Sequence, residues 1–152
     1  MSRPRSTEAA RQTAMAALAG APADELAALC GGLDLPAATA LRGPETGLVT
    51  VRGRIGGGGA PFNVGEAPVT RASVRLADGT VGHAYALGRD HAKAKLSAVL
   101  DALWQNPGWR DEIEMRVLAP LRAAQAEADA RRREETAATK VDFFTLVRGE
   151  DA

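Results

Sequence analysis

Apolar residues at helical spacing predict that the chain begins with helices. Met15 and Leu18 repeat at the period of a helix, and Gly20 ends this run. A second, shorter helix is predicted over Asp24–Cys30, where apolar residues again gather on one side. Together the two helices are expected to form a helical hairpin within residues 7–32.

The middle of the chain alternates apolar and polar residues, which is the period of half-buried β-strands. One run contains Val49 and Val51, and two more cover residues 69–76 and 81–87. Residues 47–88 are therefore expected to form a small antiparallel β-sheet.

Asp78–Gly79 joins the second and third runs and predicts a type I′ hairpin turn, because both residues tolerate positive φ. A two-residue loop here would pair Val74 with His83 on the face that looks like core. Arg75 would then pair with Gly82 on the opposite face. We expect that face to combine arginines with very small residues, which leaves room for a ligand or another backbone to approach closely.

The pattern returns to helical spacing within residues 90–139. Asp90 is the expected N-cap of a helix whose apolar stripe runs to Trp104, and an Asn-Pro-Gly sequence then ends it. A further helix begins near Trp109. Pro120 is expected to kink that helix, because proline lacks the amide donor and crowds the preceding turn.

An apolar tail, residues 141–148, follows a polar helix close to the end of the sequence. Chain ends are usually frayed and polar, so a tail of this kind is expected to dock on its own domain or on a partner. The expected interface residues are Phe143, Phe144, Leu146 and Val147.

Composition limits this α+β arrangement to one modest domain, residues 1–152. Aromatic residues make up only 4% of the chain, so the core must rest on Ala, Leu and Val. The formal net charge of +0 does not favour a nucleic-acid binder. Cys30 is the only cysteine, which excludes an intrachain disulfide and a thiolate metal cluster. No apolar run reaches the roughly 18 residues of a membrane span, and the chain is expected to be cytoplasmic.

A glycine-rich segment, residues 54–66, is a candidate anion site, because consecutive glycines free backbone amides to surround a phosphate. It lacks the Gly-Lys-Ser/Thr ending of a Walker loop, and it leads into a strand instead of a helix. A structural or interface loop and a phosphate cradle are both compatible with it. The candidate ligand- or partner-binding residues of this segment are Arg54, Gly57, Gly58, Asn63 and Glu66.

Arginines on the predicted sheet are further candidates. Arginine side chains match phosphate oxygens and equally the carboxylates of a neighbouring subunit. Convergence on one side of the sheet would make an anion or partner surface, whereas a single arginine on a strand is usually only solvated. The arginines concerned are Arg52, Arg54, Arg71, Arg75 and Arg89.

His83 and His91 are the only histidines in the chain. No cysteine or carboxylate lies at a familiar ligand spacing around them, so no metal site is expected from this chain alone. The predicted register makes His83 a buried histidine with a satisfied ring. General acid–base catalysis by either residue is the alternative, because histidine titrates near neutral pH.

Several separated stretches, in this order, resemble the PhnG family of the bacterial carbon–phosphorus lyase system: Arg52–Glu66 with Val69–Arg71, Gly82–Tyr85, Gly88–Asp90 with Asp101–Leu103, and Val141–Glu150. The resemblance spans nearly the whole chain and implies a single PhnG-like domain. It also implies a subunit that acts with PhnH, PhnI and PhnL to attach an alkylphosphonate to the ribose C1 of ATP, with release of adenine. The product is an α-D-ribose 1-alkylphosphonate 5-triphosphate, whose C–P bond PhnJ later cleaves.

In that scheme the nucleosidase-like chemistry belongs to PhnI, and PhnJ and PhnK are further partners. MgATP is a substrate of the complex, and this chain is expected to bind no cofactor of its own. Its expected role is structural, in assembly. Two alternatives stay open: a free-standing phosphate- or nucleotide-binding protein, and direct catalysis through His83 or His91.

Overall fold

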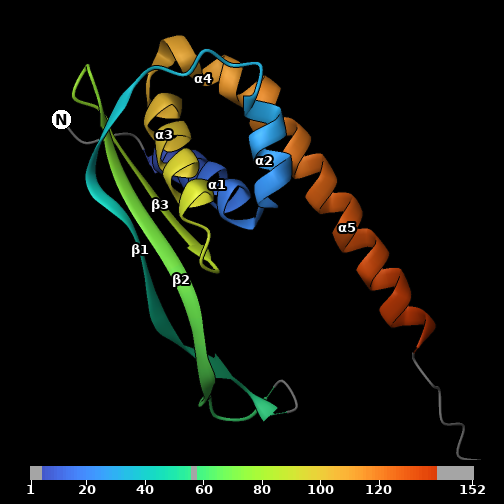
Figure 1. The fold of residues 1–152 in the computed structure, drawn as a ribbon. Helices are drawn as coiled ribbons and strands as arrows, with labels where there is room; N and C mark the ends of the chain where they lie inside the picture. Colours follow the sequence, from blue (N-terminus) through green and yellow to red (C-terminus); the bar gives the residue numbers. More distant parts are fainter. Residues whose placement is uncertain (1–4, 56–57, 140–152) are drawn as a thin grey trace, which may run out of the picture.

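The computed structural model describes residues 5–55 and 58–139 as an α+β fold. Figure 1 shows a sheet along one side of the molecule with helices packed on one of its faces. The fold class predicted from the sequence is confirmed. In the described ranges, no helix combines the length and the apolar character needed to cross a membrane.

Helices α1 (Arg5–Gly20) and α2 (Ala23–Cys30) form where the apolar spacing predicts them. Pro22 is the N-cap residue of α2 with an extended backbone, and Gly31 follows the last helical residue. Both helices pack against a later helix, α3 (His91–Gln105), and bury residues such as Leu18 and Leu26.

Three antiparallel strands make the sheet in the order β1 (Ala38–Gly53), β2 (Phe62–Leu76), β3 (Val81–Leu87). Strand β1 begins earlier than predicted and includes Pro44, in a segment for which the sequence pattern predicts no element. Its pairing with β2 shifts register between Ala40 and Glu45. Proline is tolerated there because β1 is an edge strand and the pairing is locally irregular.

The β2–β3 hairpin is present, but the predicted type I′ turn is wrong. Among the described residues positive φ occurs only at glycines, so Asp78 does not adopt it, whereas Gly79 has φ +85°. The Asp78 carboxylate instead accepts a hydrogen bond from Thr80 N at 2.9 Å. Leu76 N donates to Thr80 O at 2.9 Å, so the loop contains three residues and not two.

One extra loop residue shifts the register of β3 by one position. Val74 pairs with Gly82, and Ser73 pairs with His83. Because side chains alternate along a strand, the shift exchanges the two faces of β3. The small residues of β3 therefore lie on the helix-covered face and not beside the arginines, so that prediction is wrong.

Close packing explains why the covered face needs small residues. A Cβ added to Gly82 would lie only 2.0 Å from Ala98 O and 2.6 Å from Ala102 N, which are backbone atoms of α3. The neighbouring residues on this face, Ala84 and Ala86, are also buried. Helix α3 thus lies almost directly on the backbone of β3.

Helix α3 is the centre of the core. As predicted, Asp90 caps it: its Oδ1 accepts a hydrogen bond from Lys93 N at 2.8 Å. Leu100 and Leu103 are completely buried, and the helix contacts all three strands as well as α1 and α2. It ends at Gln105, directly before the Asn-Pro-Gly sequence that predicts its end.

A long helical stretch follows, made of α4 (Pro107–Ile113), the π-helical turn η2 (Glu114–Leu118) and α5 (Ala119–Ala138). The π-helical turn ends two residues before Pro120, where the sequence predicts a kink, and Figure 1 shows the stretch changing direction between α4 and α5. Proline cannot donate the helical hydrogen bond, and wider turns are one way a helix accommodates an irregularity.

Buried apolar side chains and several polar contacts hold this stretch to the body. Glu114 accepts hydrogen bonds from Trp104 Nε1 at 2.7 Å and Arg122 Nη1 at 2.6 Å. Gln125 Nε2 donates to Ala17 O at 2.9 Å. Beyond this point α5 leaves the body, as Figure 1 shows, and its last residues are exposed.

Some of the predicted site residues lie outside the described part of the chain. They are Gly57 of the glycine-rich segment and the expected tail interface residues Phe143, Phe144, Leu146 and Val147.

Candidate functional site

The uncovered face of the sheet brings several polar side chains together. Arg71, Ser73 and Arg75 of β2 lie directly opposite Tyr85, His83 and Val81 of β3 in the observed register. His83 is exposed on this face, so the prediction that it is buried beside Val74 is wrong. The three-residue turn is the reason, because it moves His83 to the other side of the strand.

His83 and Ser73 form a close pair, with 2.8 Å between Ser73 Oγ and His83 Nδ1. A serine nucleophile requires a histidine base that a third group, usually a carboxylate, holds in orientation. The nearby carboxylate of Asp101 instead accepts a hydrogen bond from the backbone N of His83, at 2.8 Å. Within the described residues the imidazole ring has no carboxylate partner, so these residues do not assemble a catalytic triad.

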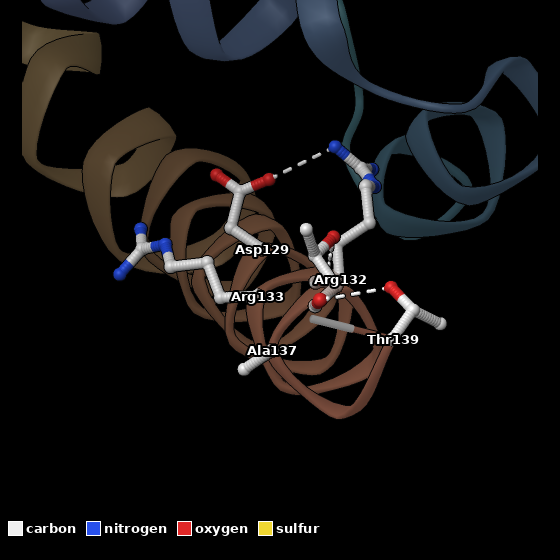
Figure 2. A pocket seen from close by; sticks show the side chains of 6 residues that line it. Asp129, Arg132, Arg133, Ala137 and Thr139 are labelled. Carbon is white, nitrogen blue, oxygen red and sulfur yellow. Dashed lines mark hydrogen bonds and ion pairs between the residues drawn. The ribbon is translucent and has the colours of Figure 1, made fainter. Parts of the chain in front are cut away.

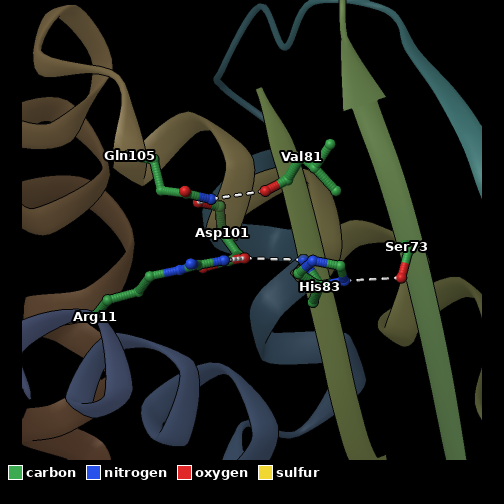
Figure 3. A network of polar contacts seen from close by, with 6 residues as sticks. All are labelled: Arg11, Ser73, Val81, His83, Asp101 and Gln105. Carbon is green, nitrogen blue, oxygen red and sulfur yellow. Dashed lines mark hydrogen bonds and ion pairs between the residues drawn. The ribbon is translucent and has the colours of Figure 1, made fainter. Parts of the chain in front are cut away.

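Asp101 is a buried junction between α1, α3 and β3, as Figure 3 shows. Arg11 Nε and Nη2 donate to its two carboxylate oxygens at 2.9 and 2.7 Å. The Asp101 side chain is only 1% exposed, and its hydrogen bonds raise the pKa of Arg11 above the ordinary value. Such a bidentate pair orients both groups strongly. The sequence offered no signal for this contact, because its two partners are 90 residues apart.

The same side of α3 closes the outer edge of β3. Gln105 Nε2 donates to Val81 O at 2.8 Å, next to the contact between Asp101 and His83 N. Two outward-facing backbone groups of this edge strand are thus already paired. An edge that is covered in this way resists pairing with another chain.

The second histidine, His91, takes part in a hydroxyl chain at the other end of the sheet. Its Nε2 lies 3.0 Å from Thr46 Oγ1, which in turn lies 2.9 Å from Thr70 Oγ1. Thr70 donates to Gly88 O at 2.7 Å. These contacts join β1, β2 and the turn before α3. No group of three His, Cys, Asp or Glu residues among those described is arranged to hold a metal ion.

The candidate arginines converge only in part. Arg71 and Arg75 share the uncovered face, where Arg71 Nη2 lies 3.1 Å from Glu45 Oε2. Arg54 lies far along the molecule, and its Nη1 donates to Gly59 O at 3.1 Å. Arg52 pairs with Asn63, which is eight residues from Arg71 along β2, and this corresponds to about 26 Å of strand. A single small anion therefore cannot contact both groups of arginines.

The remaining candidates are spread along the same axis. Gly58, Asn63 and Glu66 are exposed at the far end of β1 and β2, and Arg89 is exposed after β3. A hollow of about 230 Å³ lies where Arg71, Glu45 and Tyr85 meet. Ligand pockets usually measure about 300–1,000 Å³, so this hollow is small for a nucleotide.

A larger hollow of about 810 Å³ runs along the last turns of α5 (Figure 2). Among the described residues, its lining comes from this helix and its C-cap residue Thr139, and the polar contacts shown are local ones, such as Arg132 Nη1 to Asp129 Oδ1 at 3.2 Å. One helix face cannot surround a ligand, and these side chains are exposed. The described residues therefore do not form a binding site there.

The most distinctive surface is a two-stranded arm, defined as residues 47–55 and 58–68. Val69 pairs with Leu87 at the end of β3, and in the residues of β2 before Val69 the pairing that the described strands show is with β1 alone. Figure 1 shows the arm projecting from the helix-covered body. It carries five large apolar side chains that are 41–78% exposed: Leu48, Val51, Ile55, Phe62 and Val64.

Sequence reasoning named the glycine-rich end of the arm as a possible interface, but it missed the exposed apolar side chains of the two strands. The signal was present, because apolar residues alternate on both sides of the glycine-rich segment. Alternation alone does not tell which apolar residues the chain covers itself. A concentration of exposed apolar residues of this kind marks an interaction surface.

Comparison with known proteins agrees with the sequence resemblance. Residues 9–149 match the sequence profile of the family described as "Phosphonate metabolism protein PhnG". A relative from Rhizobium meliloti (strain 1021) is 53% identical over 145 residues, which cover 94% of this chain and 92% of the relative. That relative is named "Alpha-D-ribose 1-methylphosphonate 5-triphosphate synthase subunit PhnG".

Proposed function

The chain belongs to the PhnG family of phosphonate metabolism proteins, and we propose that it is a subunit of an α-D-ribose 1-methylphosphonate 5-triphosphate synthase. The observation that carries this proposal is the identity of 53% with a named synthase subunit, extended over 94% of this chain. The matched region includes the sheet, the arm and the helices, so the similarity is not limited to a single motif.

The partners of the subunit follow from the family. In this proposal the chain acts with PhnH, PhnI and PhnL to join an alkylphosphonate to the ribose C1 of ATP and release adenine. PhnJ and PhnK belong to the same assembly. MgATP is a substrate of the complex, and this chain supplies no cofactor.

The role of the chain is assembly, not chemistry of its own. The two histidines contact hydroxyl groups, Ser73 and Thr46, and not carboxylates in the described part of the chain. The arginines are distributed over the sheet and the arm instead of surrounding one cavity. In contrast, exposed apolar side chains are concentrated on one projecting element. This distribution suits a protein that contacts other proteins.

Co-purification tests the proposal directly. A tagged full-length chain co-expressed with PhnH, PhnI and PhnJ should co-elute with them as one complex. The complex that also contains PhnL should release adenine from ATP in the presence of methylphosphonate. A well-behaved monomer that ignores these proteins would contradict the proposal and favour a free-standing ligand-binding protein.

The tail is a separate part of the proposal. The same chain ending before Val141 lacks Phe143, Phe144, Leu146 and Val147. If the tail docks on a partner, co-elution is lost on truncation while the folded body is retained. Unchanged co-elution would exclude the tail as the required contact.

A further inference from the structure

We propose that the arm is the main docking element of this subunit, and that another subunit of the synthase adds a β-strand to the outer edge of β1 along Glu45–Val51. The arriving subunit also buries the apolar side chains of the arm. This inference rests on the proposed function, because it assumes that the partner is a different chain of the same enzyme.

The two outer edges of the sheet differ in their readiness for a further strand. At β3, side chains of α3 already pair with His83 N and Val81 O. Within residues 5–55 and 58–139, no strand pairs with the outer edge of β1, which runs over 16 residues. Uncovered edges of this kind are where an extended segment of another protein adds to a sheet.

Only part of the β1 edge is regular enough to accept a strand. Between Ala40 and Glu45 the pairing shifts register twice, and this part also contains Pro44. The residues from Glu45 to Val51 pair one to one with Arg71 to Gly65 of β2, without a shift in register. This regular stretch contains no proline and no lysine, the residues that commonly prevent pairing at exposed edges.

The direction of the backbone groups follows from one hydrogen bond. Gly88 N donates to Pro68 O at 2.8 Å, so the Pro68 carbonyl points away from β1. In an antiparallel ladder, opposite residues alternate between pairs that exchange hydrogen bonds and pairs that do not. Leu48, opposite Pro68, therefore directs its N–H and C=O outward, and so does Thr50 two residues later.

The apolar side chains of the arm require a partner that reaches more than one face. Leu48 and Val51 are three positions apart along β1, so they lie on opposite faces of the ribbon. They are 62% and 41% exposed, and on β2 Phe62 and Val64 are 45% and 61% exposed. A two-stranded ribbon is marginally stable alone in water. An added strand and the surface that carries it would extend the ribbon and cover these side chains.

The size of the arm fits a stable contact. Residues 47–55 and 58–68 provide 9 and 11 residues, 20 in all. A standard protein–protein interface uses about 20–30 residues on each side. The arm therefore supplies most of one side of such an interface without any residue of the core.

Two pairs of variants test the inference in the full-length chain, co-expressed with the partner subunits. Thr50→Pro removes one outward amide and no apolar group, whereas Thr50→Ala keeps that amide. Leu48→Asp with Val64→Asp places charge on the arm, whereas Met115→Asp alters a residue that is 70% exposed on η2, away from the arm. Unchanged thermal unfolding of each variant shows that the body is folded.

We expect Thr50→Pro and the Leu48→Asp, Val64→Asp double variant to weaken partner binding at least about tenfold, as losses at an interface centre do. Thr50→Ala and Met115→Asp should co-elute like the unchanged chain. If the unchanged chain co-elutes and the arm variants do so equally, the inference is wrong and the proposed function stands. If the unchanged chain itself does not co-elute, the proposed function fails.

A second copy of this chain is the competing occupant of the edge. If the arm variants abolish self-association of the isolated chain but leave the complex with the partner subunits intact, the strand comes from another copy. That result would overturn the inference.

Discussion

The two halves of strand β2 have similar alternating sequences but opposite surroundings. In the half that α3 covers, Val74 is 1% and Leu76 6% exposed, whereas in the half within the arm Phe62 is 45% and Val64 61% exposed. The first half contributes to the stability of the folded chain, because burial of apolar surface favours folding. The second half keeps apolar surface available for another protein. An alternating pattern thus predicts a surface that will be covered, but not which molecule covers it.

The largest effect is expected from filling the close contact of the covered half. In Gly82→Ala, the new methyl group would lie 2.0 Å from Ala98 O, and this backbone atom cannot rotate away. Helix α3 must move, and we expect a loss of about 3 kcal/mol in the free energy of unfolding. Urea denaturation measures this loss.

The matched change in the arm is Gly65→Ala, where nothing lies within 4 Å of an added Cβ. Its effect on the free energy of unfolding should stay within about 0.5 kcal/mol. Equal losses in the two variants would contradict the distinction between the covered half and the arm.

A smaller but still large effect is expected at the buried junction of the covered half. In Asp101→Asn, a neutral amide replaces a carboxylate that is only 1% exposed. The change removes the negative charge that lies 2.7 Å from Arg11 Nη2. Because Arg11 itself is 24% exposed and can regain some water, we expect a loss of about 2–3 kcal/mol, below the full cost of a buried unpaired charge.

Thermal unfolding of Asp129→Asn provides the control. That change breaks an ion pair with Arg132 in which the side chains are 52% and 74% exposed, so it should cost less than about 1 kcal/mol. A similar loss in both variants would show that Asp101 is not a buried junction.

Acid should affect the body through Glu114. Burial raises the pKa of this carboxyl group, but hydrogen bonds from Arg122 and Trp104 outweigh burial and hold the pKa below its ordinary value. Its contribution to stability is therefore present above the unfolded pKa of about 4.3 and is lost as the pH falls through the lower folded value. The paired side chains are 36% and 34% exposed, so the contribution is less than about 1 kcal/mol.

Comparison with Glu114→Gln checks the sign of this effect. The stability difference between the unchanged chain and the variant should be constant near pH 7 and shrink as the pH falls below the unfolded pKa of about 4.3. A difference that grows toward acid pH would contradict the assigned cause.

The smallest effect is expected on the uncovered face. His83→Ala removes an exposed ring whose contact is Ser73 Oγ at 2.8 Å, and the free energy of unfolding should change by less than about 0.5 kcal/mol. In the assembled synthase, adenine release from ATP should continue, with His91→Ala as the matched control. Loss of turnover in a complex that still assembles would assign a catalytic role to the altered histidine.

Local signals predicted most of the elements. Asp90 begins α3 through its side-chain contact with Lys93 N, and the Asn-Pro-Gly sequence ends it. The short helix after Pro22 ends before Gly31. These signals act over a few residues, so they are readable without knowledge of the rest of the fold.

The hairpin shows where local signals were insufficient. Asp78–Gly79 predicted the turn, but Asp78 avoids positive φ and its side chain bonds to Thr80 N. One additional loop residue then moved His83 from the predicted core to the surface. Both turns satisfy the local sequence, and the packing of Gly82 beneath α3 agrees only with the observed one.

The sequence by itself determined the α+β class, the order of helices and strands, the caps of α3 and the family, because each depends on neighbouring residues or on a match along the chain. The tertiary structure decided which face of β3 is buried, that Arg11 meets Asp101, and that one half of β2 lies under a helix while the other projects as an arm. These features arise from contacts between residues far apart in the chain. Whether a hydrophobic side chain is covered depends on which element arrives above it, and no local pattern contains that information.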